Sequence, residues 1–193
     1  MTNRAVFLDR DGTIIEDVGH LTKPSQVQLI PGASEAIVML NKAGFKVLVA
    51  TNQSVIARGY IDERELAKIH EVLSEKLAAF GARVDGYYYC PHHPEFGGGG
   101  RGTVCDCRKP EAGLLRRAAK DLDLNLAGSF SVGDKAADII AGKNAGCGTV
   151  LVKTGYGLEE LAGLPADKRP DYVADDLLAA ASWITDERKL RAT

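Results

Sequence analysis

Residues 5–13 read Ala-Val-Phe-Leu-Asp-Arg-Asp-Gly-Thr, so four apolar residues lead directly into two aspartates one residue apart. A short apolar run without polar alternation is typical of a strand buried on both faces of a parallel sheet. Similar runs occupy residues 47–50, 130–132 and 149–152, and residues 84–89 form a further strand candidate. The 5–13 stretch therefore predicts one strand of a parallel sheet, with its polar residues at the carboxyl end.

Segments with helical periodicity separate these strands. Residues 33–43 carry apolar side chains on one face and stop at Gly44. Asp62 and Glu65 have the spacing of a capping box, and apolar residues continue from there at helical spacing to Gly81. Residues 111–122, 136–144 and 175–184 supply three more helices. This alternation predicts an α/β fold, Rossmann-like and three-layered, with a mostly parallel sheet and right-handed crossovers.

Length and composition limit the protein classes that remain. The chain has 193 residues, 45% of them hydrophobic, and no segment marks a boundary, so we expect a single domain over 1–193. The net charge of -2 and the pI of about 6.1 provide no basic field for nucleic acid. No apolar run approaches the roughly 18 residues of a membrane span. The first strand is predicted close to Met1, which leaves no room for a leader, so we expect a cytoplasmic protein without a membrane or nucleic-acid partner.

Polar residues follow three of the four apolar runs where the predicted strands end. Ligands of open α/β sheets bind just beyond the carboxyl ends of the strands, so these residues should meet. The sets are Asp9-Arg10-Asp11-Gly12-Thr13, Thr51-Asn52-Gln53-Ser54 and Gly133-Asp134-Lys135, and Arg108-Lys109-Pro110 lies just before a helix. Each set alone is also compatible with a solvated turn. Carboxylates, a hydroxyl and cations at one sheet edge together predict phosphoryl transfer.

Each residue type suits one requirement of that reaction. Enzymes accelerate phosphate-monoester hydrolysis by up to about 10²¹, whereas a positioned acid or base supplies only about 10² to 10⁴. Covalent and electrostatic catalysis must supply the remainder. We therefore expect Asp9 to attack phosphorus, and Asp9 and Asp134 to hold Mg²⁺, a hard ion that prefers oxygen ligands. Asp11 would offer the metal its backbone carbonyl and act as acid and base, while Thr51 and Lys109 bind phosphoryl oxygens.

In their order and spacing, these four motifs resemble those of the haloacid dehalogenase (HAD) superfamily of phosphohydrolases. The resemblance covers almost the whole chain and implies the same roles for the residues named above. No long insertion follows the first or second motif, so a large cap domain is not expected.

A cysteine-rich loop at about 90–109 predicts a second metal. Cys90-Pro91-His92-His93 and Cys105-Asp106-Cys107 together offer three thiolates and one imidazole, which is the ligand set of a closed, structural zinc site. In a reducing compartment such a cluster indicates metal rather than disulfides. The spacing leaves His92 and His93 as alternatives.

The same loop, with residues 51–59, resembles a narrower family, the D-glycero-D-manno-heptose 1,7-bisphosphate 7-phosphatases. That resemblance implies zinc on Cys90, His92, Cys105 and Cys107, in a loop that holds Arg108 and Lys109 at the site. One departure is Val55, where we expect a glycine. The resemblance also implies substrate contacts from Asp17, Val18, Gly19, His20, Asn52, Gln53, Ser54, Arg108 and Lys135.

The narrower resemblance implies a small sugar bisphosphate as substrate and a step toward nucleotide-activated heptose for lipopolysaccharide cores. We expect a monomer. A histidinol-phosphate phosphatase is the nearest alternative, because it shares the zinc loop and all four motifs. A nucleic-acid 3′-end phosphatase does not predict a zinc loop, and the charge balance disfavours it. A non-catalytic zinc- and phosphate-binding module is the alternative of another class, disfavoured by the intact Asp9 and Asp11.

Overall fold

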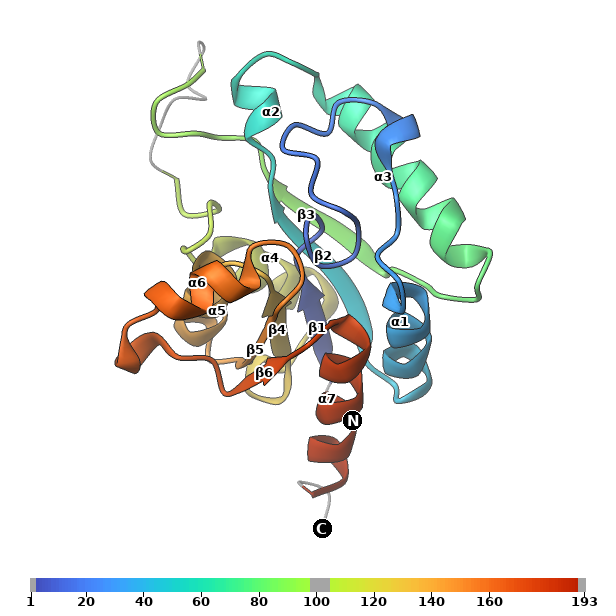
Figure 1. Cartoon of the computed structure of the whole chain (residues 1–193), viewed down its shortest axis with the longest axis vertical. Helices are drawn as coiled ribbons and strands as arrows, with labels where there is room; N and C mark the ends of the chain where they lie inside the picture. Colours follow the sequence, from blue (N-terminus) through green and yellow to red (C-terminus); the bar gives the residue numbers. More distant parts are fainter. Residues whose placement is uncertain (1–2, 98–104, 191–193) are drawn as a thin grey trace.

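The central sheet is entirely parallel, and its strand order reverses beside the first strand. The computed structural model describes residues 3–97 and 105–190, without the side chains of 187–190. The strand order is β3-β2-β1-β4-β5-β6, so the chain builds outward on one side of β1 and then on the other (Figure 1). The strands are β1 (Ala5–Leu8), β2 (Lys46–Asn52), β3 (Gly86–Cys90), β4 (Phe130–Gly133), β5 (Gly148–Val152) and β6 (Tyr172–Ala174). Between β1 and β4 lies the switch point where such sheets bind ligands.

Helices cover both faces of this sheet. The helices α1 (Ala33–Lys42), α3 (Glu63–Ala78) and α7 (Leu177–Leu190) lie on one side, and α4 (Gly113–Leu122), α5 (Ala136–Ala145) and α6 (Gly157–Gly163) on the other (Figure 1). Strand β1 shows why both faces are needed, because Val6 and Leu8 pack into the core with α1 and α3, whereas Ala5 and Phe7 pack with α4. All four residues are fully buried, which explains the unbroken apolar run.

The main predicted elements are confirmed with small shifts at their ends. Strand β3 spans 86–90 rather than 84–89, α4 begins at 113 rather than 111, and α7 covers 177–190 rather than 175–184. The predicted capping box is present at the start of α3: Asp62 Oδ1 accepts from the Glu65 amide at 2.8 Å, and Glu65 Oε2 accepts from the Asp62 amide at 2.9 Å. Gly44 has φ +81°, a conformation that ends α1 and that glycine adopts readily.

Besides the 3₁₀ turns, one strand and two short α-helices of the described chain were absent from the prediction. They are β6, the four-residue α2 (Ser54–Ala57) and α6. None is long enough to show a clear hydrophobic period, and β6 is an edge strand of three residues. Tertiary contacts therefore define them.

The segments that would carry a large cap are short. Between β1 and α1 the chain forms one 3₁₀ turn (Pro24–Gln26), and after β2 only α2 precedes α3. No helix within residues 3–97 and 105–190 has the length and apolar character that a membrane span requires. The sequence-predicted fold, without a large cap, is thus confirmed.

Candidate active site

Three buried aspartates meet at the switch point. Asp9 follows β1 and Asp134 follows β4, and the register pairs Leu8 with Val132, which brings both residues to the same sheet edge. The carboxylate oxygens of Asp9, Asp134 and Asp138 lie within 4.8 Å of one another, and all three residues are buried. The predicted meeting of positions 9 and 134 is therefore what the structure shows.

Lys109 inserts its ammonium group between two of these carboxylates. Its Nζ donates to Asp9 Oδ1 at 2.9 Å, to the Ala50 carbonyl at 2.6 Å, and to Asp138 Oδ1. Burial alone would lower the pKa of Lys109, but the charges of Asp138 and Asp9 outweigh it and raise the pKa to about 12. Burial acts to raise the pKa of Asp9, and Lys109 overrides it and holds that pKa below its ordinary value. Asp9 is therefore ionised at neutral pH, as a nucleophile must be.

Asp134 has one oxygen held and one oxygen free. Its Oδ2 accepts from the Tyr156 amide at 2.9 Å, whereas its buried Oδ1 has no hydrogen-bond partner among the residues that the structure describes. Burial, with the charge of Asp9, raises the pKa of Asp134 to about 7. A buried oxygen without a partner is costly, so the site fits a ligand that satisfies it.

The residues present fit a small, hard divalent cation. Asp9 and Asp134 offer carboxylate oxygens of the kind that Mg²⁺ prefers. Asp138 is already engaged, because its Oδ1 pairs with Lys109 and its Oδ2 accepts from the Lys135 amide at 3.1 Å, at the start of α5. Asp138 thus anchors Lys109 and the start of the helix.

The segment after β5 shapes the cradle around Asp134, and it was not among the predicted site segments. Thr154 Oγ1 donates to the Gly12 carbonyl at 2.6 Å, which ties this segment to the turn that follows β1. A Cβ on Gly12 (φ +81°) would lie 2.3 Å from Asp134 Oδ2, and one on Gly155 (φ +56°) would lie 2.2 Å from the same oxygen. Only glycine permits both approaches.

Thr51 and Asp11 are joined through one amide. Gln53 Nε2 donates to Asp11 Oδ2 at 3.0 Å and to Thr51 Oγ1 at 2.9 Å, and Gln53 itself is buried. The Asn52 side chain makes two hydrogen bonds with the backbone of Lys109: it donates to the carbonyl and accepts from the amide, at 3.0 Å each. The second motif therefore orients both the first motif and the lysine.

A small inner pocket of about 60 Å³ opens beside an outer cleft of about 210 Å³, and both are lined by Asp11, Asn52 and Lys135. Of the predicted substrate residues, the outer cleft is lined by Asp17, Gly19, Asn52, Gln53, Ser54, Arg108 and Lys135. Val18 and His20 are not among its lining residues. Val18 is 45% exposed. The His20 ring lies 5.2 Å from that of Tyr60.

Three cations, Arg10, Arg108 and Lys135, line the outer cleft, and the last two are anchored as follows. Lys135 Nζ pairs with Asp17 Oδ2 at 3.1 Å and lies 4.9 Å from the centre of the Tyr156 ring. Arg108 Nη1 donates to the His92 carbonyl at 2.9 Å, which links it to the cysteine loop. The cleft therefore suits an anionic ligand.

Three cysteines and one histidine form a second cluster beside this cleft. The sulfur of Cys107 lies 3.2 Å from those of Cys90 and Cys105, and His92 Nδ1 lies 3.3 Å from the Cys107 sulfur. Two sulfur ligands of a tetrahedral Zn²⁺ would lie about 3.8 Å apart, given Zn–S bonds near 2.3 Å. The His93 ring instead packs against Phe96. Residues 98–104 of the loop predicted at about 90–109 lie outside the described residues.

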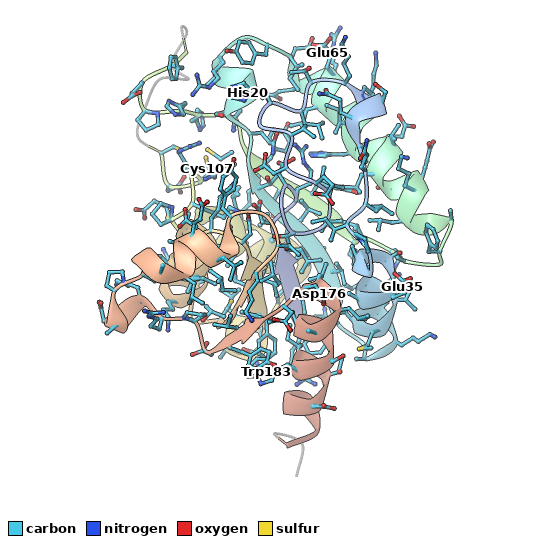
Figure 2. The ribbon with its side chains drawn as sticks, viewed as in Figure 1. His20, Glu35, Glu65, Cys107, Asp176 and Trp183 are labelled. Atoms are coloured by element: carbon cyan, nitrogen blue, oxygen red, sulfur yellow. The ribbon has the colours of Figure 1, made fainter. Side chains whose placement is uncertain are left out.

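Figure 2 places Cys107 and His20 toward the end of the molecule that carries α2, away from both termini. His20 and the cysteine loop thus lie toward the same end of the molecule.

Comparison with known proteins gives one consistent result. The HAD-hydrolase-like family matches residues 106–180. A D-glycero-D-manno-heptose-1,7-bisphosphate 7-phosphatase of Thermosynechococcus vestitus is 44% identical over 95% of this chain and 96% of its own length. The chain belongs to this phosphatase family. Its Escherichia coli member is 42% identical over 96% of this chain and 95% of its own. A solved D,D-heptose 1,7-bisphosphate phosphatase from B. bronchiseptica, complexed with magnesium and phosphate, has a TM-score of 0.84 and 38% identity over 95% of this chain and 99% of that one.

The cradle around Asp134 leads to a prediction about Gly155. We expect Gly155→Ala to lower the free energy of unfolding by about 1–3 kcal/mol more than Gly81→Ala, as overpacking does. Gly81 is the matched control, because it also has positive φ (+76°) but nothing within 4 Å of an added Cβ. Urea denaturation of both variants measures the difference. Equal losses would mean that Asp134 does not need this close approach.

Proposed function

We propose that this chain is a magnesium-dependent phosphatase that removes the 7-phosphate of D-glycero-D-manno-heptose 1,7-bisphosphate. The products would be heptose 1-phosphate and inorganic phosphate, on the way to nucleotide-activated heptose for lipopolysaccharide cores. The observation that carries the proposal is the meeting of Asp9 and Asp134 beside Lys109. Support for the substrate comes from the relative of that name, 44% identical over 95% of this chain.

In the first step, an Asp9 carboxylate oxygen forms a bond to phosphorus while the bond from phosphorus to the C7 oxygen breaks. Asp11 gives its proton to the departing oxygen. Lys109, 2.9 Å from Asp9 Oδ1, and the Thr51 hydroxyl would bind the phosphoryl oxygens.

In the second step, water attacks the phosphorus of the aspartyl phosphate. Asp11 takes the proton from this water, and the bond from phosphorus to Asp9 breaks. Phosphate leaves, the Asp9 carboxylate is restored, and Asp11 is protonated again.

Asp9 and Asp134 would hold Mg²⁺ through their carboxylates, and Asp11 through its backbone carbonyl. The ion, when bound, neutralises charge that develops on the phosphoryl group. Asp134 Oδ1, buried without a partner, is the oxygen that gains most from it.

The cleft favours a substrate with two anionic groups over histidinol phosphate, the nearest alternative. Arg108 and Lys135 line the outer cleft, and Lys135 also lines the inner pocket that contains Asp9. These cations suit a second phosphate, whereas the amine of histidinol phosphate would be repelled by them.

The proposal predicts the outcome of a phosphate-release panel. With Mg²⁺, the wild type should prefer heptose 1,7-bisphosphate to histidinol phosphate, fructose bisphosphate and a 3′-phosphorylated oligonucleotide. Asp9→Asn should lose at least about 10³-fold in rate, because the nucleophile is gone. A preference for histidinol phosphate would reverse the substrate assignment, and equal inertness of both proteins would favour a binding module.

A proton should be released when Mg²⁺ binds near neutral pH. The pKa of Asp134 is raised to about 7, so below that pH the carboxyl is protonated and a proton competes with the ion. The apparent affinity for Mg²⁺ should fall as the pH drops from 8 to 6. Titration calorimetry in buffers of different ionisation enthalpy measures the released proton. Asp134→Asn should abolish both effects, and an affinity independent of pH would contradict the assignment.

We propose that Cys90, His92, Cys105 and Cys107 hold a structural Zn²⁺. All four ligands belong to the protein, so the site has no open position for catalysis. The hydrogen bond from Arg108 to the His92 carbonyl connects this zinc site to the substrate cleft, because it fixes a cleft cation to the backbone of a metal ligand. Zinc would cross-link the two ends of a loop that spans 90 to 109.

Cys107→Ser should therefore lower zinc content, thermal stability and substrate affinity together. We expect the KM for the bisphosphate to rise about tenfold, the value of one charged hydrogen bond from Arg108. Elemental analysis, thermal unfolding and kinetics measure the three effects. Cys147→Ser is the control for loss of a buried thiol, since Cys147 lies outside the cluster and should leave one zinc per chain. Purified, reduced wild type without metal would overturn the zinc assignment.

The substrate contacts from Asp17, Val18, Gly19, His20, Asn52, Gln53, Ser54, Arg108 and Lys135 stay predictions. So do a single domain over 1–193, a cytoplasmic location and a monomer.

A further inference from the structure

Arg10 is a buried cation between the two aspartates of the first motif, and the proposed mechanism gives it no role. It is 1% exposed. Its Nη2 donates to both carboxylate oxygens of Asp11, at 3.0 and 2.9 Å, and its Nε lies 3.3 and 3.2 Å from the same two. The guanidinium therefore faces the carboxylate of its neighbour with one whole edge.

The other edge of Arg10 is held by two neutral groups from distant parts of the chain. Nη2 donates to Gln53 Oε1 at 2.9 Å, and Nη1 lies 3.3 Å from His70 Nε2. Because an arginine has donors only, His70 Nε2 must accept, which puts the imidazole proton on Nδ1. Arg10 is thus fixed from the second motif and from α3.

His70 is built to remain a neutral acceptor. It lies on the buried face of α3 and is 6% exposed. Its ring stacks on Tyr87, with centroids 4.4 Å apart and planes at 13°. Burial, reinforced by the charge of Arg10, lowers the pKa of His70 to about 3, so it carries no charge at neutral pH. A charged His70 would repel Arg10, whereas the neutral ring accepts from it.

We infer that His70 and Arg10 are positioning residues for Asp11, the proposed acid and base. His70 orients the Arg10 guanidinium, and Arg10 fixes the direction in which the Asp11 carboxyl group points. Removing the acceptor leaves Arg10 Nη1 buried and unpaired, so the guanidinium turns away and Asp11 loses its main anchor. This inference rests on the proposed phosphatase function.

The consequence depends on the leaving group. A sugar oxygen leaves as a poor anion and needs the Asp11 proton, whereas p-nitrophenolate is a stable anion that leaves without one. The ratio of kcat/KM for the two substrates reports this first step, and it does not depend on how much of a sample is folded. A merely structural defect lowers both values equally and leaves the ratio unchanged.

The test compares four proteins on heptose 1,7-bisphosphate and on p-nitrophenyl phosphate. His70→Phe keeps the stacking ring and removes the acceptor, and His70→Gln restores an acceptor near the position of Nε2. Tyr87→Phe is the matched control, because it removes only the hydroxyl that contacts Ser74 at 2.8 Å and keeps the ring against His70.

We expect His70→Phe to lower the sugar-to-aryl ratio by about 10- to 100-fold, part of the full contribution of a general acid. His70→Gln and Tyr87→Phe should stay within about threefold of the wild-type ratio. An unchanged ratio in His70→Phe, or a loss that His70→Gln does not restore, overturns the inference while the phosphatase function stands. A wild type that hydrolyses neither substrate overturns the proposed function instead.

Discussion

The ion pair of Lys109 with Asp9 and Asp138 is the interaction on which the site depends. Three buried carboxylates within 4.8 Å of one another would repel strongly without a cation among them. Lys109 supplies that cation, and its position depends on a segment about 100 residues away from Asp9. The acidic cluster can therefore form only when the chain after β3 has returned to the carboxyl edge of the sheet.

Several contacts fix the position of the segment that carries Arg108 and Lys109 at the sheet edge. Asn52 holds the Lys109 backbone through both its amide and its carbonyl, so the end of β2 sets where the lysine enters. One residue earlier, Arg108 is tied to the His92 carbonyl, in the cysteine cluster. The two adjacent side chains thus point to different parts of the site: Lys109 is buried against the nucleophile, and Arg108 lies in the outer cleft. A loop anchored at only one point could not fix the orientations of both side chains.

The sequence predicted the site residues that the geometry of parallel strands brings together. It did not predict the contacts that depend on tertiary packing. Asp9, Thr51 and Asp134 were predictable because polar residues after buried parallel strands share one edge. The role of residues 154–157 was not predictable, because the backbone amide of Tyr156 that donates to Asp134 has no side-chain signature. His70 fits the apolar spacing of α3, so its contact with Arg10 becomes evident only in the folded chain, where α3 meets the turn that follows β1. For the segment after β5, the one available signal in the sequence was the polar Lys153-Thr154 pair that follows the fourth apolar run.

Three identical carboxylates acquire three different properties from their surroundings. Lys109 holds the pKa of Asp9 low, which keeps an ionised oxygen ready for phosphorus. Asp138 gives one oxygen to Lys109 and the other to the Lys135 amide, so it has little left for a metal. Asp134 receives a single backbone amide and keeps one oxygen without a partner among the described residues. Burial, with the charge of Asp9, raises its pKa to about 7. All three carboxylates are buried to a similar degree. Their different hydrogen-bond and ion-pair partners therefore distinguish the nucleophile Asp9, the anchor Asp138 and the metal ligand Asp134.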